Sequence, residues 1–117
     1  MTNIPPGYSS VLPYFFVEDA SGFCMFLVDG LGGEEVGRTV IEGRIANACV
    51  RLGTATVMVS EASKDWPPMP ASYYLYVDDA DASQRRAIAA GAEEIMPVED
   101  RPYGDRQGGG RDAWGNL

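Results

Sequence analysis

The side chains that could do chemistry include two acidic pairs, Glu18/Asp19 and Asp78/Asp79. Paired carboxylates can act as general acid and general base when they share a cleft. Both pairs, however, stand where a predicted strand gives way to a predicted helix. An aspartate at such a corner caps the helix and interacts favourably with its N-terminal dipole. We therefore predict capping for both pairs and assign no catalytic residue.

Histidine is absent from the sequence, which removes the commonest general base near neutral pH and the commonest nitrogen ligand of metals. Cys24 and Cys49 lie inside apolar segments rather than in paired spacings. This placement predicts reduced core thiols in a cytoplasmic protein. Arg106 follows Asp105 in a predicted tight turn, where we expect a structural role rather than anion binding.

Length and charge narrow the class of protein. A chain of 117 residues is long enough for one core, so we expect a single domain spanning 1–117. The formal charge of −8 argues against nucleic-acid binding and is explained by solubility or by attraction of a cationic ligand. The apolar stretches are too short to cross a membrane, and the N-terminus has no signal-peptide pattern.

One phrase occurs twice. Residues 14–20 read YFFVEDA and residues 74–80 read YLYVDDA, and GGEEV at 32–36 is matched by GAEEI at 91–95. Each copy contains a predicted strand, a helix, a glycine stop, an acidic pair and another strand. Two copies at a spacing near sixty indicate an internal duplication.

The pattern along the chain gives the predicted elements. Aromatic and β-branched residues predict a strand over 9–17, and helical spacing follows Asp19 up to Gly32. Further strands are predicted at 35–41, 44–52 and 54–60, a proline-rich linker at 64–72, a strand at 73–77, a helix at 80–90 with Ala87 and Ile88 facing inward, and a strand at 93–99. We predict an α+β fold of two βαβββ modules, at about 8–60 and 71–117, that forms a curved mixed sheet around a cleft. The final strand of the second module is missing from the pattern.

Side chains alternate between the two faces of a strand, so each repeated strand has an apolar face and a more polar aromatic one. Phe15, Val17, Leu75 and Val77 are expected to pack on the helices. The more polar aromatic face suits a partly solvated cleft, although its tyrosines could instead fill a core between two sheets. Trp66 in the linker could cover the site or contact a second subunit, and the alternative is an exposed aromatic side chain in a mobile loop. The predicted ligand-binding residues are Leu12, Tyr14, Phe16, Asn47, Met58, Ser72, Tyr74, Tyr76, Trp114 and Asn116. For Asn47 the alternative is a strand-edge amide, for Met58 ordinary core, and for Trp114 and Asn116 hairpin packing.

The duplicated unit, together with PVEDRPYGDRQGGGRDAWGN near its end, resembles the vicinal-oxygen-chelate superfamily, which includes glyoxalases, bleomycin-resistance proteins and extradiol dioxygenases. IPPGYSSVLPYFFVEDA, LGGEEVGR and LYVDDADA are similar to its PhnB-like group, so the resemblance spans residues 4–117. Enzymes of this superfamily hold a divalent metal through histidine, glutamate or glutamine. The resemblance places these ligand positions at Leu12, at Ser72, near Met58 or Val59, and beyond Leu117. The histidines common in the PhnB-like group fall at Ser9, Asn47, Tyr74 and Asn116.

No carboxylate or imidazole occupies those positions, so we predict no metal and no cofactor. The favoured hypothesis is a homodimeric protein that binds a small aromatic or cationic molecule without chemistry. The dimer is expected because the second module lacks a strand and leaves an edge that a partner could cover. The alternatives are a metal-dependent or metal-free lyase, isomerase or dioxygenase, and a non-catalytic interaction module.

Overall fold

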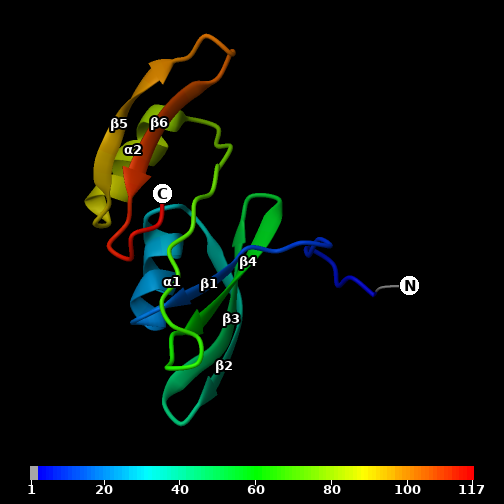
Figure 1. The fold of residues 1–117 in the computed structure, drawn as a ribbon. Helices are drawn as coiled ribbons and strands as arrows, with labels where there is room; N and C mark the ends of the chain where they lie inside the picture. Colours follow the sequence, from blue (N-terminus) through cyan, green and yellow to red (C-terminus); the bar gives the residue numbers. More distant parts are fainter. Residues whose placement is uncertain (1–2) are drawn as a thin grey trace.

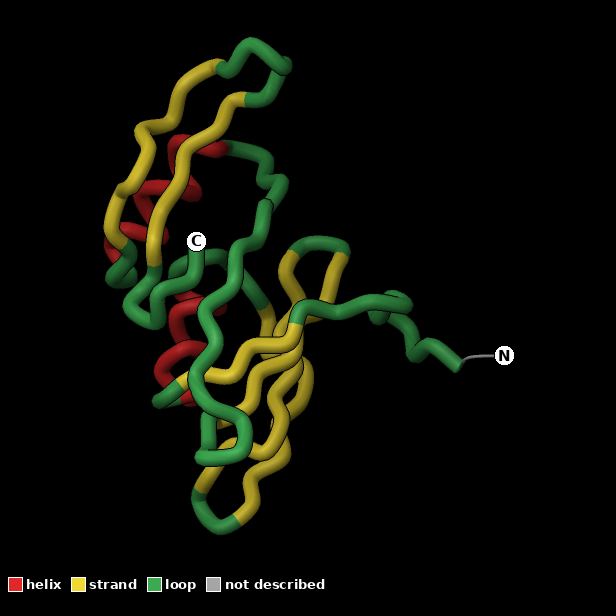
Figure 2. The backbone as a smooth tube through the Cα atoms, in the orientation of Figure 1, coloured by secondary structure: helices red, strands yellow, loops and turns green. Residues whose placement is uncertain are grey.

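The computed structural model describes residues 3–117, and its elements follow one another in the order strand, helix, strands, helix, strands (Figures 1 and 2). The elements are β1 (Tyr14–Val17), α1 (Ala20–Asp29), β2 (Glu34–Ile41), β3 (Arg44–Leu52), β4 (Ala55–Glu61), α2 (Ala80–Ala89), β5 (Glu93–Asp100) and β6 (Arg106–Arg111). Among the described residues, no helix is both long and apolar enough to cross a membrane.

The first module forms a four-stranded sheet, called sheet A, in the order β1-β4-β3-β2. β1 runs parallel to β4 with Tyr14 beside Met58, and the other pairs are antiparallel. The β2–β3 hairpin turns at Glu42 and Gly43, both with positive φ, as two-residue hairpins require. One face of sheet A is covered by α1, and the hydrophobic core lies between them.

Helix α1 is held at its start by two carboxylates. Asp19 accepts a hydrogen bond from the Gly22 amide at 3.1 Å, as predicted for a cap. Glu61, at the end of β4, accepts bonds from the Asp19 and Ala20 amides at 3.0 and 2.9 Å. These bonds satisfy amides that an α-helix leaves unpaired, so β4 fixes the position of the helix. The residues that α1 buries are Ala20, Phe23, Cys24, Phe26 and Leu27.

The second module repeats this order up to its second strand after the helix, with residues 72–77 in the place of β1. Asp79 accepts from the Ala82 amide at 3.1 Å, which confirms the predicted cap of α2. β5 and β6 pair antiparallel in a separate sheet. Arg106 joins α2 to this hairpin through ion pairs with Asp81 and Asp100 at 2.9 and 3.2 Å, the structural role expected of it. The two modules meet where Arg86 donates to the Asp29 carbonyl at 2.7 Å.

Two strand predictions and two predictions of burial are wrong. The strand predicted over 9–17 begins only at Tyr14, because the preceding residues have no ladder partner and Ser9 bonds locally to the Val11 carbonyl. Residues 73–77 are extended but not a strand, since a ladder along them is missing. Ile88 remains 40 % exposed and Val77 41 % exposed, because the space beside α2 is open.

Candidate functional site

The face of sheet A opposite α1, here called the open face, carries the first-module residues expected in a site. Phe15 and Val17 are 1 % and 3 % exposed on the α1 side, as predicted. Alternation therefore puts Tyr14 and Phe16 on the open face, and the register puts Met58 beside Tyr14 on the neighbouring strand.

A chain of hydrogen bonds crosses the open face from β3 to β1 and β4. The Cys49 thiol donates to Asn47 Oδ1 at 3.5 Å, and Asn47 Nδ2 donates to the Tyr14 hydroxyl at 3.4 Å. The Tyr14 and Ser60 hydroxyls lie 2.6 Å apart, and Ser60 Oγ donates to the Ala46 carbonyl at 2.7 Å. Because the Ser60 proton is used there, Tyr14 donates to Ser60. The Tyr14 ring is thus fixed in orientation by polar contacts at its tip.

An aromatic row, defined as Tyr14, Phe16 and Trp66, runs across the same face. The Tyr14 and Phe16 rings stack with centroids 4.9 Å apart, and Phe16 and Trp66 stack at 5.6 Å with an interplanar angle of 13°. The linker is held at this place by the bond from the Met69 amide to the Phe16 carbonyl at 3.0 Å. Trp66 nevertheless remains 62 % exposed, so the row presents ring surface to solvent.

The N-terminal arm covers the other end of the open face. Thr56 Oγ1 donates to the Gly7 carbonyl at 2.7 Å, and Thr56 is fully buried as a result. Gly7 has φ +84°, and a β-carbon there would collide with the guanidinium of Arg51. The Arg51 side chain could move aside, but the positive φ at this position favours glycine. The arm and the linker therefore frame the open face from two sides.

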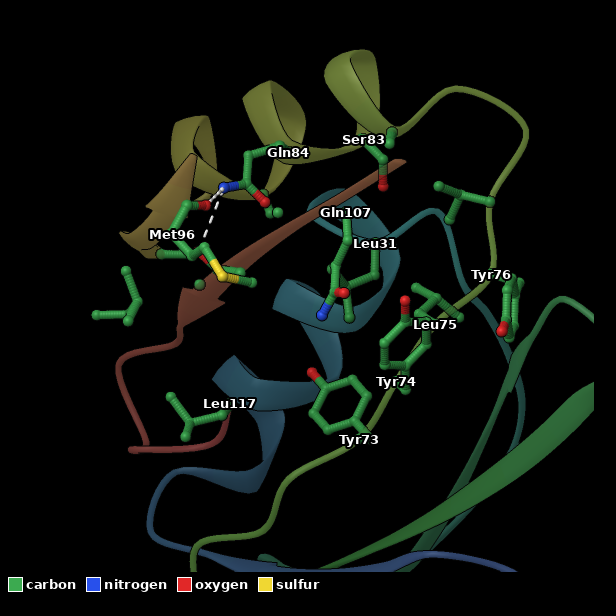
Figure 3. Close-up of a pocket in the computed structure, with 18 of the residues that line it drawn as sticks. Leu31, Tyr73, Tyr74, Leu75, Tyr76, Ser83, Gln84, Met96, Gln107 and Leu117 are labelled. Atoms are coloured by element: carbon green, nitrogen blue, oxygen red, sulfur yellow. Dashed lines mark hydrogen bonds between the residues drawn. The ribbon is translucent and has the colours of Figure 1, made fainter. Parts of the chain in front are cut away.

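The second module contains a groove of about 990 Å³, here called the strand groove, between residues 72–77 and β6 (Figure 3). Tyr74 and Tyr76 both donate to Asp105 Oδ2, at 2.8 and 3.3 Å. The hydrogen bond with Asp105, helped by desolvation, raises the pKa of Tyr74 to about 12. Of the predicted site residues, Ser72, Tyr74, Tyr76 and Asn116 line this groove.

Trp114 and Asn116 form the anchor of the C-terminal turn. The Trp114 ring packs against Phe23 at 5.2 Å, and its Nε1 donates to the Glu18 carbonyl at 2.6 Å. Asn116 is 2 % exposed: its Oδ1 accepts from the Ala71 amide and its Nδ2 donates to Asp112. The polar atoms of the Asn116 side chain thus have partners within the protein.

The ten predicted ligand-binding residues therefore do not form one site but lie in different regions of the structure. Four share the open face, four line the strand groove, Leu12 is half-buried just before β1, and Trp114 packs on α1. Their role in binding stays a prediction. Ser60 was missed, although it lies two residues after Met58 on one strand, and this spacing was the signal that could have found it.

Comparison with known proteins shows which sequences and which folds are similar to this chain. No family model matches it. An uncharacterized protein of Mycobacterium bovis is 31 % identical over 97 % of this chain and 81 % of its own length, and one of Mycobacterium tuberculosis is 31 % identical over 97 % and 72 %. Among solved structures, TioX of Micromonospora has a TM-score of 0.73 at 25 % identity, covering 92 % of this chain and 90 % of its own. A glyoxalase/bleomycin resistance protein of Streptomyces has a TM-score of 0.69 at 23 % identity, covering 92 % and 95 %. The chain has the fold of the glyoxalase/bleomycin-resistance/dioxygenase superfamily.

This fold confirms the α+β prediction and agrees with the resemblance, whereas the PhnB-like subgroup and the duplication stay predictions. The fold is also similar to that of TnmS3, described as an antibiotic binding protein from Streptomyces, with a TM-score of 0.67 at 21 % identity and coverage of 92 % and 91 %.

The metal that many enzymes of this superfamily hold does not fit the residues at the ligand positions inferred within residues 3–117. The inferred ligand positions carry a leucine, a serine, and a methionine or valine, which supply neither imidazole nor carboxylate. Across residues 3–117, no group of three or more histidine, cysteine, aspartate or glutamate side chains is placed to hold an ion. Divalent metals in such sites need N, O or thiolate donors, so we derive no step through a metal.

Proposed function

We propose that this protein binds a small planar aromatic molecule, neutral or cationic, on the open face of sheet A and does not transform it. The observation that carries the proposal is the aromatic row. Its three rings are stacked in sequence, and the outermost, Trp66, offers an exposed face. A planar ligand extends such a stack, and each aromatic pair contributes about 0.5–1.5 kcal/mol beyond the area it buries.

Electrostatics favour a cation over an anion. The faces of tyrosine, phenylalanine and tryptophan rings attract cations, most strongly when the contact excludes water. The chain has nine basic and seventeen acidic residues, and its charge of −8 raises the local concentration of cations. The antibiotic binding described for TnmS3 is consistent with a binding role on this fold.

Binding without transformation is supported by the hydrogen bonds of the polar groups beside the row. The Tyr14 proton is donated to Ser60, whose own proton goes to a main-chain carbonyl. Asn47 completes the chain and is not an acid or a base. These groups can orient a ligand by hydrogen bonding, and they have no histidine to accept a proton near neutral pH.

We also infer that two copies of the chain associate. The open face and the linker expose the large apolar side chains Trp66 and Met69, which are 62 % and 55 % exposed. A second copy packed against the linker beside the aromatic row would remove apolar surface from water. Light scattering coupled to gel filtration should give twice the mass of one chain, and the mass of a single chain at micromolar concentration would contradict this inference.

A thermal-shift experiment tests the binding function. The probes are a cationic acridine, an anionic naphthalene sulfonate and the non-aromatic cation choline. We expect the acridine to raise the melting temperature most. A ligand at about a hundred times its Kd stabilises the native state by about 2.7 kcal/mol, which is several degrees for a domain of this size.

Two variants locate the site. Phe16→Ala removes the middle ring of the row and should abolish the shift caused by the acridine. Tyr103→Ala removes a tyrosine that is 65 % exposed on a turn of the second module, and should leave the shift intact. The proposal is wrong when no probe shifts the melting temperature, or when both variants respond as the unmodified protein does.

A further inference from the structure

The chain of hydrogen bonds across the open face includes one side chain whose bonding capacity is only partly used. The Ser60 proton goes to the Ala46 carbonyl at 2.7 Å, and the Tyr14 proton goes to Ser60 at 2.6 Å. A hydroxyl carries a single proton, so neither group has a donor left for a ligand. Asn47 differs, because an amide group has two N–H donors and an oxygen with two lone pairs. Within residues 3–117, only one of its donors and one of its lone pairs are engaged.

The contacts that Asn47 does make are weak. Its Nδ2 lies 3.4 Å from the Tyr14 hydroxyl, beyond the usual range of about 2.7–3.2 Å, and the donor to its Oδ1 is the Cys49 thiol, a weak donor. Asn116 is the opposite case, since it is 2 % exposed and has bonds of 2.8 and 3.0 Å. Asn116 serves the fold, whereas the half-buried Asn47 can exchange weak internal contacts for contacts with a ligand.

The surface of sheet A next to Asn47 is bare. Gly37 on β2 pairs with Cys49 on β3, and the side chains of paired residues point to the same face of a sheet. A β-carbon at Gly37 would meet no atom within 4 Å. Thr39, the partner of Asn47 in the same ladder, is exposed. The edge of a ligand can therefore approach the Asn47 amide from the β2 side.

Tyr14 shows that Asn47 is within reach of a planar group stacked in the aromatic row. The Tyr14 ring stacks on Phe16 at β1, and its hydroxyl contacts the Asn47 amide at β3. Only β4 separates these strands, so β1 and β3 lie about 10 Å apart. Three fused rings are longer than one phenol. A ligand of that size that stacks with the row and points across the sheet, as Tyr14 does, reaches the Asn47 side chain.

We propose that Asn47 determines which planar molecule binds on the open face, by pairing its free N–H and its Oδ1 with a ligand edge that carries an acceptor beside a donor. Lactams and neutral cyclic amidines have such an edge. Asparagine pairs with the edge of adenine in the same two-point way. This inference rests on the proposed function, because stacking on the row supplies the affinity and Asn47 supplies the choice between ligands.

A comparison of two ligands of one shape tests the proposal on the unmodified protein. Phenanthridinone is a planar three-ring lactam, and the corresponding lactone, benzocoumarin, has a ring oxygen in place of the N–H. The lactone therefore offers no donor and sets a lone pair against Asn47 Oδ1. Isothermal titration calorimetry should give a Kd about tenfold lower for the lactam, which corresponds to about 1.4 kcal/mol.

The variant Asn47→Asp should exchange this preference. It replaces the amide donors by a second acceptor, so it should bind the lactam about tenfold more weakly. It should bind the aminophenanthridinium ion more tightly than the unmodified protein does, because that ion has two adjacent N–H donors that match a carboxylate. Gln107→Glu on β6 is the matched control. It adds the same charge away from the open face and should leave the affinities for lactam and lactone unchanged.

The outcomes separate this proposal from the binding function on which it rests. Equal affinities for lactam and lactone, both lost in Phe16→Ala, would leave stacking on the row in place and overturn the role of Asn47. Binding of neither compound would overturn both. The role of Asn47 is also overturned when Asn47→Asp and Gln107→Glu change the affinities for the lactam and the cation alike, because the effect then belongs to the added charge.

Discussion

Replacement of Asn116 by alanine should destabilise the protein strongly, although Asn116 lies on a turn near the end of the sequence. Its side chain is 2 % exposed and joins the linker to the C-terminal turn. Oδ1 accepts from the Ala71 amide at 2.8 Å, and Nδ2 donates to the Asp112 carboxylate at 3.0 Å. Asn116→Ala removes both bonds at once.

The magnitude follows from these partners. An amide left unpaired in a partly buried position costs about 1–3 kcal/mol, and loss of a hydrogen bond to a charged group costs about 1.5–3 kcal/mol. Asp112 keeps the hydrogen bonds from the backbone amides of Trp114 and Asn116 at 2.9 and 3.0 Å, so its carboxylate loses only part of its hydrogen bonding. We therefore expect a loss of about 3 kcal/mol in the free energy of unfolding.

Urea denaturation followed by circular dichroism measures this loss, with Asn47→Ala as the matched control. Asn47 makes longer contacts, of 3.4 and 3.5 Å, and its removal should cost less than about 1 kcal/mol. Asn116→Asp adds a pH signature, because it sets a second carboxylate against Asp112 and raises one pKa of the pair. Because the carboxyl pKa is higher in the folded state than in the unfolded state, lowering the pH through the raised pKa removes the repulsion between the two carboxylates. This variant should therefore regain stability in mild acid. If Asn116→Ala lowers the free energy of unfolding by less than about 0.5 kcal/mol, the role assigned to the two Asn116 hydrogen bonds is refuted.

Three further predictions follow from single contacts. Glu61→Gln weakens the bonds to the first amides of α1 and should lower the free energy of unfolding in urea by about 1 kcal/mol. The control Glu42→Gln, at an exposed position, should leave this free energy unchanged. Equal effects of the two variants would contradict the role assigned to Glu61. The Tyr74 phenol, with its pKa raised from 10.0 to about 12, favours the folded state below pH 10 and loses this contribution as the pH rises through 12. Ultraviolet titration of the phenol should show a lower pKa in Asp105→Asn, and an unchanged value would exclude the hydrogen bond as its cause. Burial raises the pKa of the Cys24 thiol to about 11, so in the variant Cys49→Ala the Cys24 thiol should react with Ellman's reagent at pH 8 only after denaturation. Rapid reaction of that variant in its native state would contradict the burial of Cys24.

Features set by neighbouring residues were predicted well from the sequence. Asp19 and Asp79 cap the two helices as expected, because a cap depends on amides two or three residues away. The strand 44–52 has the predicted bounds, and the hairpin before it turns at Gly43. Alternation along β1 correctly separated Phe15 from Tyr14, since one face of that strand is buried.

Features set by distant partners could not be read from the sequence. Residues 73–77 have the composition of a strand, yet a strand exists only when a neighbour completes its ladder. The same limit applies to Trp114, whose aromatic ring suggested a cleft and which packs on α1, 91 residues earlier in the chain at Phe23. Trp66 was recognised as a possible cover, but its stacking on Phe16 depends on how the linker folds back.

The two indole N–H signals in a nitrogen–proton NMR spectrum, one from each tryptophan, test the central claim most directly. Trp66 stacks on Phe16 in the aromatic row, whereas Trp114 donates its N–H to the Glu18 carbonyl on the other side of the sheet. During titration with the cationic acridine, the Trp66 signal, assigned with Trp66→Phe, should shift saturably while the Trp114 signal remains in place. A saturable shift of Trp114 alone, or of neither signal, would contradict binding on the open face.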